Sequence, residues 1–440
     1  MIKIDNLFSF FVILLPFLYQ YASPLYSVSL GELLLLPFIL IYLADLLIHP
    51  KRPLNVDKYM LLYLGVVIVT TCIAGFFGPY FSSYDFFTLS LRVFFYAVLI
   101  FVARTHFKLS MAMHFYNVLC VMFSAYLLLQ FFAHMLYGIN LPLTLPLPVF
   151  APDLRGYMID GNLASYYSYM FRPSSLFIEP SYFTSYVMGC LCYNLFYTDD
   201  KHPSITIYNF FISIIISVAL VAAVTGGGII AMLLVWSIFI ITKIISAEHH
   251  TVQLHLKYIL ISITILVGLV ILFSSELAAG GIEHTFWGKG SSLSNRVFRG
   301  FWVYGETDLF HQIFGVGLNN LADYMTYYGL STPYDEPNLD IIASLVGSLV
   351  CSGWFGLLSL CGFLVSLYHR QFTPFGKMIV LMIVYFTTFD VIIFSFRWGF
   401  YCILAYSVCN IRNFQTGWLP ASLVRNRNNI YLNSVSFKGG

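Results

Sequence analysis

The sequence predicts an all-α fold, a polytopic bundle of membrane helices, and three observations lead to this fold class. Apolar residues occupy 59% of the 440 positions and charged residues only 10%, well below the roughly 25% of an ordinary soluble domain. The mean hydropathy is +0.81. The apolar residues also fall in runs of about 20, the length of a helix that crosses a bilayer. We therefore interpret residues 1–440 as a single integral membrane domain.

About twelve apolar runs are predicted to be transmembrane helices. Two of them are separated only by Thr225-Gly-Gly-Gly228, a sequence that lets two helix ends pack closely or leaves backbone N–H groups to bind an anion. The predicted spans are residues 7–23, 29–48, 59–78, 86–103, 113–137, 181–198, 205–224, 228–246, 256–275, 341–368, 377–395 and 398–411.

The distribution of Lys and Arg predicts the orientation of these spans, because short cytoplasmic connections are enriched in both. With a cytoplasmic N-terminus, 15 of the 22 basic residues lie on the inner side and Arg92 lies within a span. Both termini are then cytoplasmic, with a tail at residues 412–440. Two connections, residues 138–180 and 276–340, become large outer loops. The six outer basic residues are Arg155, Arg172, Lys289, Arg296, Arg299 and Arg397.

The first outer loop contains a stretch with proline at positions 142, 146 and 148, which cannot form a regular helix because each proline removes a donor and restricts its predecessor. Later in the loop, residues 172–181 read Arg-Pro-Ser-Ser-Leu-Phe-Ile-Glu-Pro-Ser. Pro180 is typical of a first helical turn and places Glu179 at the helix N-terminus, where the helix dipole favours a carboxylate. Arg172 and Glu179 are therefore expected to lie close together, either in a functional site or as a structural ion pair.

The second outer loop contains Ser-Asn-Arg-Val-Phe-Arg-Gly-Phe-Trp at residues 294–302. If this segment is helical, Arg296 and Arg299 are three residues apart and lie on one face. Two guanidinium groups outside the membrane favour a diphosphate ligand; the alternative is that they extend to lipid headgroups. The glycine-rich residues 315–320 are predicted to form a tight turn rather than a nucleotide-binding loop.

Histidine is the obvious candidate for a base on the outer side, and His284 and His311 are the two possibilities. Within the bilayer Arg92 and Asp390 are costly charges, and Asp390 is expected to pair with an arginine such as Arg397. All eight cysteines lie in apolar segments, which predicts core packing rather than disulfides or zinc. Neither outer loop contains an Asp-x-Asp motif, so we predict no metal and no cofactor.

Residues 172–181 resemble the Arg, Phe-x-Glu-Pro-Ser pattern of Wzy-type polysaccharide polymerases, the family that includes O-antigen polymerases and, more distantly, O-antigen ligases. Residues 294–302, followed by Ile-Phe-Gly-Val-Gly-Leu-Asn at 313–319, resemble the second outer-loop pattern of that family. The resemblance implies a metal-independent, GT-C-like glycosyltransferase of the bacterial inner membrane. It would join undecaprenyl-diphosphate-linked oligosaccharides on the periplasmic side into O-antigen, capsule or exopolysaccharide.

The resemblance also implies roles for individual residues. The arginines Arg172, Arg296 and Arg299 would bind the diphosphate leaving group, and Glu179 would orient an arginine or accept the proton of the attacking hydroxyl. His284 is the alternative base. Further candidates for substrate binding, by stacking on sugars or by charge, are Arg155, Tyr167, Tyr169, Trp287, Lys289 and Trp302.

Two other functions remain open at this point. An O-antigen ligase would transfer the glycan to a lipid A core or a protein, and a flippase or transporter would move a lipid-linked oligosaccharide without chemistry. Partners implied by the resemblance are undecaprenyl-diphosphate-linked oligosaccharides, membrane lipids and a chain-length regulator acting as co-polymerase. No nucleic-acid partner is predicted.

Overall fold

A computed structural model of the chain describes residues 4–25, 28–48, 57–149, 172–197, 206–245, 293–333 and 342–415. The secondary structure of these residues is helical apart from two isolated β-bridges, which confirms the predicted all-α class. The helices are α1 (Ile4–Leu18), α2 (Leu30–Ile48), α3 (Lys58–Phe77), α4 (Ser83–His106), α5 (Leu109–Tyr137), α8 (Pro180–Phe196), α9 (Ile207–Ala222), α10 (Gly226–Ile245), the π-helical turn η1 (Ser294–Phe298), α13 (Arg299–Glu306), α14 (Leu309–Phe314), α15 (Leu321–Tyr327), α16 (Ser344–His369), α17 (Pro374–Phe389) and α18 (Phe396–Gln415).

Eleven of the twelve predicted spans coincide with a helix of the structure, and the twelfth, residues 256–275, lies outside the described residues. Within the described part of the chain, six helices are long and apolar enough to cross a membrane: α2, α3, α4, α5, α10 and α16. Some predicted boundaries are wrong. The first span ends at Leu18 rather than at residue 23, and α17 ends at Phe389 rather than at residue 395, because an apolar run continues past the end of each helix.

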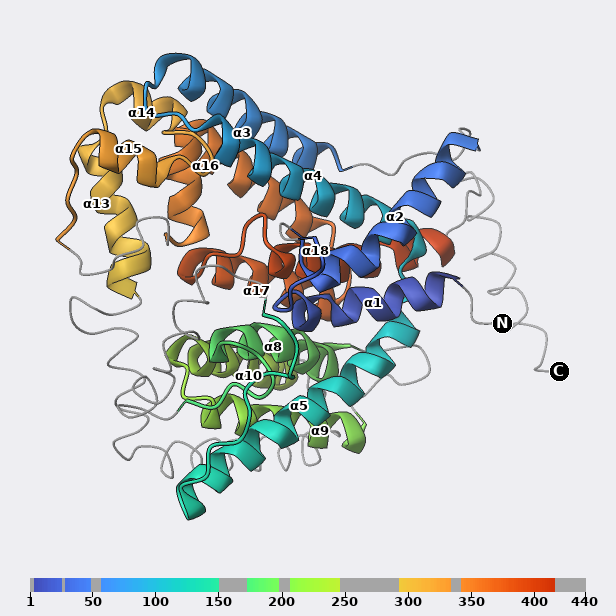
Figure 1. The fold of residues 1–440 in the computed structure, drawn as a ribbon. Helices are drawn as coiled ribbons and strands as arrows, with labels where there is room; N and C mark the ends of the chain where they lie inside the picture. Colours follow the sequence, from blue (N-terminus) through green and yellow to red (C-terminus); the bar gives the residue numbers. More distant parts are fainter. Residues whose placement is uncertain are drawn as a thin grey trace.

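Polar contacts between segments far apart in the sequence mark two ends of the bundle. At one end Asp57, before α3, accepts hydrogen bonds from Arg370 and Tyr406, both at 2.7 Å, and we call this the Asp57 end. At the other end Ser344, which begins α16, donates its backbone N–H to the carbonyl of Asp390. We call it the Asp390 end. Figure 1 shows α13, α14 and α15 gathered beside α3 and α16.

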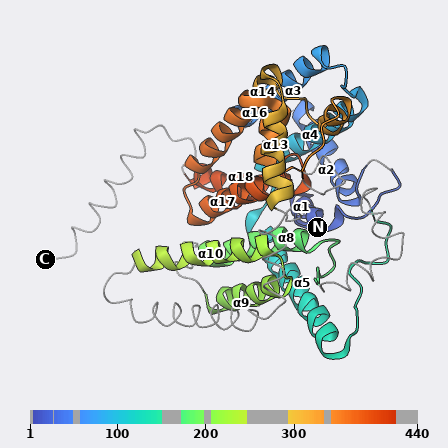
Figure 2. The same ribbon diagram turned by 90° about the vertical axis from the view of Figure 1, so that its left-hand side faces the viewer.

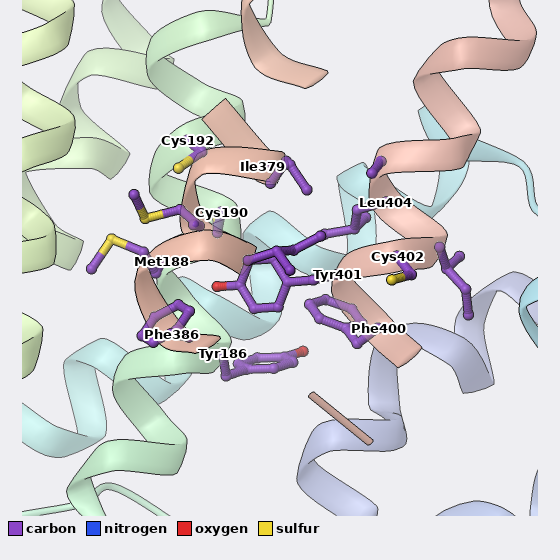
Figure 3. Close-up of a cluster of buried hydrophobic side chains, with 14 of the residues drawn as sticks. Tyr186, Met188, Cys190, Cys192, Ile379, Phe386, Phe400, Tyr401, Cys402 and Leu404 are labelled. Carbon is purple, nitrogen blue, oxygen red and sulfur yellow. The ribbon is translucent and has the colours of Figure 1, made fainter. Parts of the chain in front are cut away.

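The centre of the bundle is filled by apolar and aromatic side chains from α8, α17 and α18, which Figure 3 shows converging around Tyr401. The Tyr401 hydroxyl donates to the carbonyl of Ser185 at 2.6 Å, and the Tyr116 hydroxyl donates to the carbonyl of Tyr186. In Figure 2, α8 lies beside α10, with α17 and α18 above them. These helices form a fixed base for the residues that begin α8 and α18.

Close packing explains the glycines between α9 and α10. A Cβ on Gly228 would meet the side chain of Thr184 on α8, and the Tyr385 hydroxyl of α17 donates to the Gly227 carbonyl at 2.6 Å. The structure therefore places this segment in a helix junction, in agreement with the packing interpretation.

Helix α16 is broken at Gly353, where φ is +63° and ψ is −162°. The break leaves carbonyls of the preceding turn without helical hydrogen-bond donors. The predicted turn at residues 315–320, between α14 and α15, supplies the missing donors. The backbone N–H of Val316 donates to the Val350 carbonyl and that of Gly317 to the Cys351 carbonyl, both at 3.0 Å. Broken helices at membrane depth depend on such partners.

Replacing Gly353 by alanine is therefore expected to lower the free energy of unfolding by about 3 kcal/mol, since the new Cβ would overlap the Ile313 carbonyl in a strained conformation. Gly362 is the matched control, because it lies in the same helix with no neighbouring heavy atom near the position of a Cβ. Alanine there should be neutral or stabilising by up to about 1 kcal/mol. Equal thermal stability of the two variants would contradict the assigned break.

Candidate functional site

The segment before α8 is held in place by two buried glutamines. Gln20, which follows α1, donates to the Leu176 carbonyl at 2.6 Å and accepts from the Ile178 N–H at 2.9 Å. Gln130 of α5 donates to the Ser175 carbonyl and accepts from the Ser175 N–H, both at 2.8 Å. A buried side-chain amide that donates to one carbonyl of a loop and accepts from one N–H of the same loop fixes the loop backbone. These contacts fix the chain just before Glu179.

The same segment is also anchored by packing. Phe177 is completely buried against Phe17, Phe123 and Tyr186. Beyond it, Pro180 occupies the first helical position and Glu179 is the N-cap of α8, as predicted from the sequence. The Glu179 Oε2 atom accepts a hydrogen bond from the Ser181 hydroxyl at 2.8 Å.

The expected pairing of Arg172 with Glu179 is not observed. Arg172 is partly buried, and no ion pair joins it to Glu179 within the residues that the structure describes. The six residues between them contain a turn, closed by the Phe177 N–H donating to the Ser174 carbonyl, and the glutamine contacts fix this turn in place.

Asp390, the C-cap of α17, binds two arginines from different parts of the chain. Its Oδ1 accepts from Nη1 of Arg296 in η1, and its Oδ2 accepts from Nη1 of Arg397 in α18. The pairing with Arg397 was predicted from the sequence, whereas the pairing with Arg296 was not. Burial opposes ionisation of Asp390, but attraction to Arg397 and Arg296 outweighs it and lowers the pKa of this carboxyl below its usual value.

Arg397 connects this pair to the start of α8. Its guanidinium lies 4.9 Å from the centre of the Tyr182 ring in the first turn of α8 and donates to the Val391 carbonyl at 2.7 Å, and the Tyr182 N–H in turn donates to the Glu179 carbonyl at 3.0 Å. Only 7% of its side chain is exposed. Glu179, Arg296, Asp390 and Arg397 thus form one group, which we call the Asp390 cluster. It joins residues 172–181 to residues 294–302.

The local helix type separates the two arginines of the second segment. Residues 294–298 form a π-helical turn, in which the Arg299 N–H donates to the Ser294 carbonyl. A π-turn holds more residues than an α-turn, so positions three apart are rotated farther from one another. Arg296 has 26% of its side chain exposed, whereas Arg299 is completely buried. The expectation that both face a ligand from one accessible surface is therefore corrected, and only Arg296 is accessible.

Two other candidate residues, Trp302 and His311, pack against neighbouring side chains in structural positions. Trp302 packs against a second apolar cluster that contains Tyr80 and Tyr324. His311 is buried beside the same two tyrosines, and its Nδ1 atom lies 2.9 Å from Oδ1 of Asp308. The structural interpretation of His311 is therefore favoured over a role as base.

Several candidates lie outside the described residues: Arg155, Tyr167, Tyr169, His284, Trp287 and Lys289. Sequence reasoning, in turn, missed some residues near the cluster. Glu32 forms a reciprocal N-terminal cap with Ser29, a pairing that the pattern Ser-x-x-Glu before an apolar run could have indicated. No local pattern marked Gln20 or Gln130.

Among the described residues, no group of three or more His, Cys, Asp or Glu side chains lies close enough together to hold a metal ion. Comparison with models of known protein families finds no match, and comparison with curated proteins finds none either. Fold and site alone therefore define the class of protein. In the described part of the chain, this is a helical protein with six helices able to cross a membrane and a cluster of two arginines and two acidic residues at one end of its bundle.

Proposed function

We propose that the protein is a Wzy-type polysaccharide polymerase that joins undecaprenyl-diphosphate-linked oligosaccharides on the outer face of the bacterial inner membrane. The single observation that carries this proposal is the Asp390 cluster. It brings Arg296, from residues 294–302, into one group with the start of α8, where Glu179 lies, through Asp390, Arg397 and the Tyr182 ring. Under this proposal the Asp390 end of the bundle faces the periplasm and both termini are cytoplasmic.

The charges of the cluster favour a diphosphate ligand. The four residues of the cluster carry two positive and two negative charges, but within it two guanidinium groups share the single carboxylate of Asp390, so the Arg296–Asp390–Arg397 part carries a net positive charge in surroundings where water is scarce. Electrostatic interactions are stronger there than in bulk water. Arg296 is the accessible member, and we assign it the diphosphate. Arg397 is a positioning residue, which holds Asp390, and the buried Arg299 is not assigned to the ligand.

The reaction would be a direct displacement at the anomeric carbon of the donor sugar. A hydroxyl oxygen of the acceptor glycan forms the new bond to that carbon, and the bond to the diphosphate breaks with its electron pair on the diphosphate oxygen. Donors aimed at this leaving group stabilise the transition state more than the ground state, because negative charge develops there. Glu179 accepts the hydroxyl proton. The anomeric configuration is inverted.

Replacement of Glu179 by glutamine is expected to reduce the rate of glycan elongation at least about a hundredfold, since an amide cannot accept the proton. The free energy of unfolding should change by no more than about 1 kcal/mol, because within the described residues the Glu179 side chain makes a single hydrogen bond, to the Ser181 hydroxyl. The measurement is elongation rate against pH for both proteins, with Ser181→Ala as control. A hundredfold loss in the control as well would assign Glu179 a structural role.

The function is tested with the purified chain in liposomes and a lipid-diphosphate-linked repeat unit from the same organism. A ladder of lengthening glycans, formed without nucleotide sugar or added metal, is the expected result. Movement of an unchanged repeat unit across the bilayer would indicate a flippase instead. Transfer only in the presence of a lipid A core would indicate a ligase.

A further inference from the structure

A second arginine site lies beside the Asp390 cluster, within a membrane helix. Arg92 is nine residues from the start of α4, which at 1.5 Å per residue places it about 14 Å along the helix. It lies 3.7 Å from Glu32 in the first turn of α2. Helix α2 therefore begins at the depth of Arg92, about 14 Å from the level at which α4 begins.

Glu32 is held rigidly and in turn holds Arg92. This carboxylate is buried, its Oε2 accepts from the Ser29 N–H at 2.9 Å, and its Oε1 accepts from the Tyr96 hydroxyl at 2.8 Å. Arg92 approaches the same Oε1 through Nε, at ion-pair distance. Glu32 thus fixes the direction of the arginine without enclosing it.

The surroundings of Arg92 on α4 are apolar and exposed. One third of its side chain, 33%, is exposed, and the neighbouring residues Leu91 and Phe94 are 54% and 67% exposed. An arginine at such a position is costly in a bilayer and is retained where it has a functional partner. A lipid with a phosphate-bearing headgroup meets both parts of this surface, since its chain contacts the apolar side chains and its phosphate contacts the guanidinium.

Tyr19 connects this position to the Asp390 cluster. Its ring stacks on Phe396 with 4.2 Å between ring centres, and it interacts electrostatically with Arg92, Glu32 and Arg397. Arg92 and Arg296 are the accessible arginines of this region, with 33% and 26% of their side chains exposed, whereas Arg397 is only 7% exposed.

We propose that Arg92 binds the diphosphate of a second isoprenoid lipid at the seam between α2 and α4. This inference rests on the proposed polymerase function, which consumes two lipid-linked glycans and so needs two cationic headgroup sites. Arg296 holds the diphosphate that leaves. Arg92 holds the diphosphate of the acceptor, whose sugar hydroxyl attacks, and the acceptor chain remains along the apolar face of α4.

The test counts bound lipids by native mass spectrometry, with the full chain in phosphatidylcholine nanodiscs and undecaprenyl diphosphate without glycan as the probe. The wild type is expected to bind two lipids per chain, and Arg92→Gln one, with at least about tenfold weaker affinity at the lost site. The matched control is Arg370→Gln at the Asp57 end, which removes an arginine of similar exposure, 35%, from a similar ion pair. It should bind two.

A second variant separates binding from folding, because Arg92→Gln leaves a buried carboxylate unpaired. Arg92→Gln combined with Glu32→Gln removes both charges, and it should fold and still bind only one lipid. Two lipids bound to either variant would overturn the proposal. So would equal occupation of the Arg92 site by inorganic pyrophosphate, which would make it a free-anion site, or by phosphatidylglycerol, which would make it a general headgroup site.

Failure of the polymerase proposal would look different. Lipid binding is measured without turnover. A chain that binds two lipid diphosphates but elongates no glycan would therefore contradict the polymerase proposal and support the Arg92 site. If the chain elongates glycans and the Arg92→Gln variant still binds two lipids, the polymerase proposal is supported and the Arg92 site is contradicted.

Discussion

Replacing Asp390 by alanine is expected to lower the free energy of unfolding by about 3 to 5 kcal/mol, enough to deplete the folded protein. Asp390 is the carboxylate partner of both Arg296 and Arg397, and Arg397 is almost fully buried. Removing one partner of a buried pair leaves an uncompensated charge, which costs far more than the intact pair contributes. The measurement is thermal unfolding in detergent, followed by size-exclusion chromatography.

Glu306 provides the matched control, because it is an exposed acidic residue at the end of α13 near the same end of the bundle. Glu306→Gln should leave stability within about 0.5 kcal/mol of the wild type. Equal unfolding temperatures for Asp390→Ala and Glu306→Gln would show that the ion pairs of Asp390 do not hold η1 against α17.

The pH dependence of Asp390→Asn follows from the lowered pKa of Asp390. A carboxyl with a depressed folded-state pKa contributes its full stability above the ordinary aspartate pKa of about 3.9 and loses it as the pH falls through the lower folded value. The difference in Tm between wild type and Asp390→Asn should therefore stay constant from about pH 8 to pH 5. It should shrink only below about pH 4.

The second large effect is expected for Arg296→Ala, which should abolish polymer formation while the protein level stays normal. Removing one preorganised donor from a developing negative charge typically costs about 10² to 10³ in rate. Asp390 keeps Arg397 as its partner, so the fold persists. Arg296→Lys should recover part of the activity, since it restores the charge without the planar fork of donors.

Polymer length on a gel and protein level in the membrane are the two measurements. Lys377→Ala is the control, because Lys377 is exposed and lies at the opposite end of α17 from Asp390. Polymer of near-normal length from Arg296→Ala would remove this arginine from the proposed site.

The helices were predictable from sequence because each corresponds to one continuous run of apolar residues. Proline and acidic residues also gave the start of α8 correctly, with Pro180 first and Glu179 before it. The helix ends were less predictable, since Asp390 follows apolar residues that continue after it. Its pairing with Arg397 is local, seven positions apart, and local spacing was enough to suggest it.

The rest of the site depends on contacts between distant segments, which no periodicity records. Gln20 bonds to a loop more than 150 positions away, and Arg296 bonds to Asp390 at a separation of 94. The π-turn that buries Arg299 arises where η1 meets α16 and α17, so an α-helical spacing rule placed that arginine wrongly. Long-range packing decides between such local alternatives.

The separation of Arg296 and Asp390 also sets an order of events during synthesis. The arginine leaves the ribosome 94 residues before its carboxylate, and at about 5 to 20 residues per second this interval lasts roughly 5 to 20 seconds. During that time η1 cannot adopt its final pairing. The cluster therefore becomes complete only when α17 has been made, so a nascent chain that stops short of that helix carries the second motif segment without a working site.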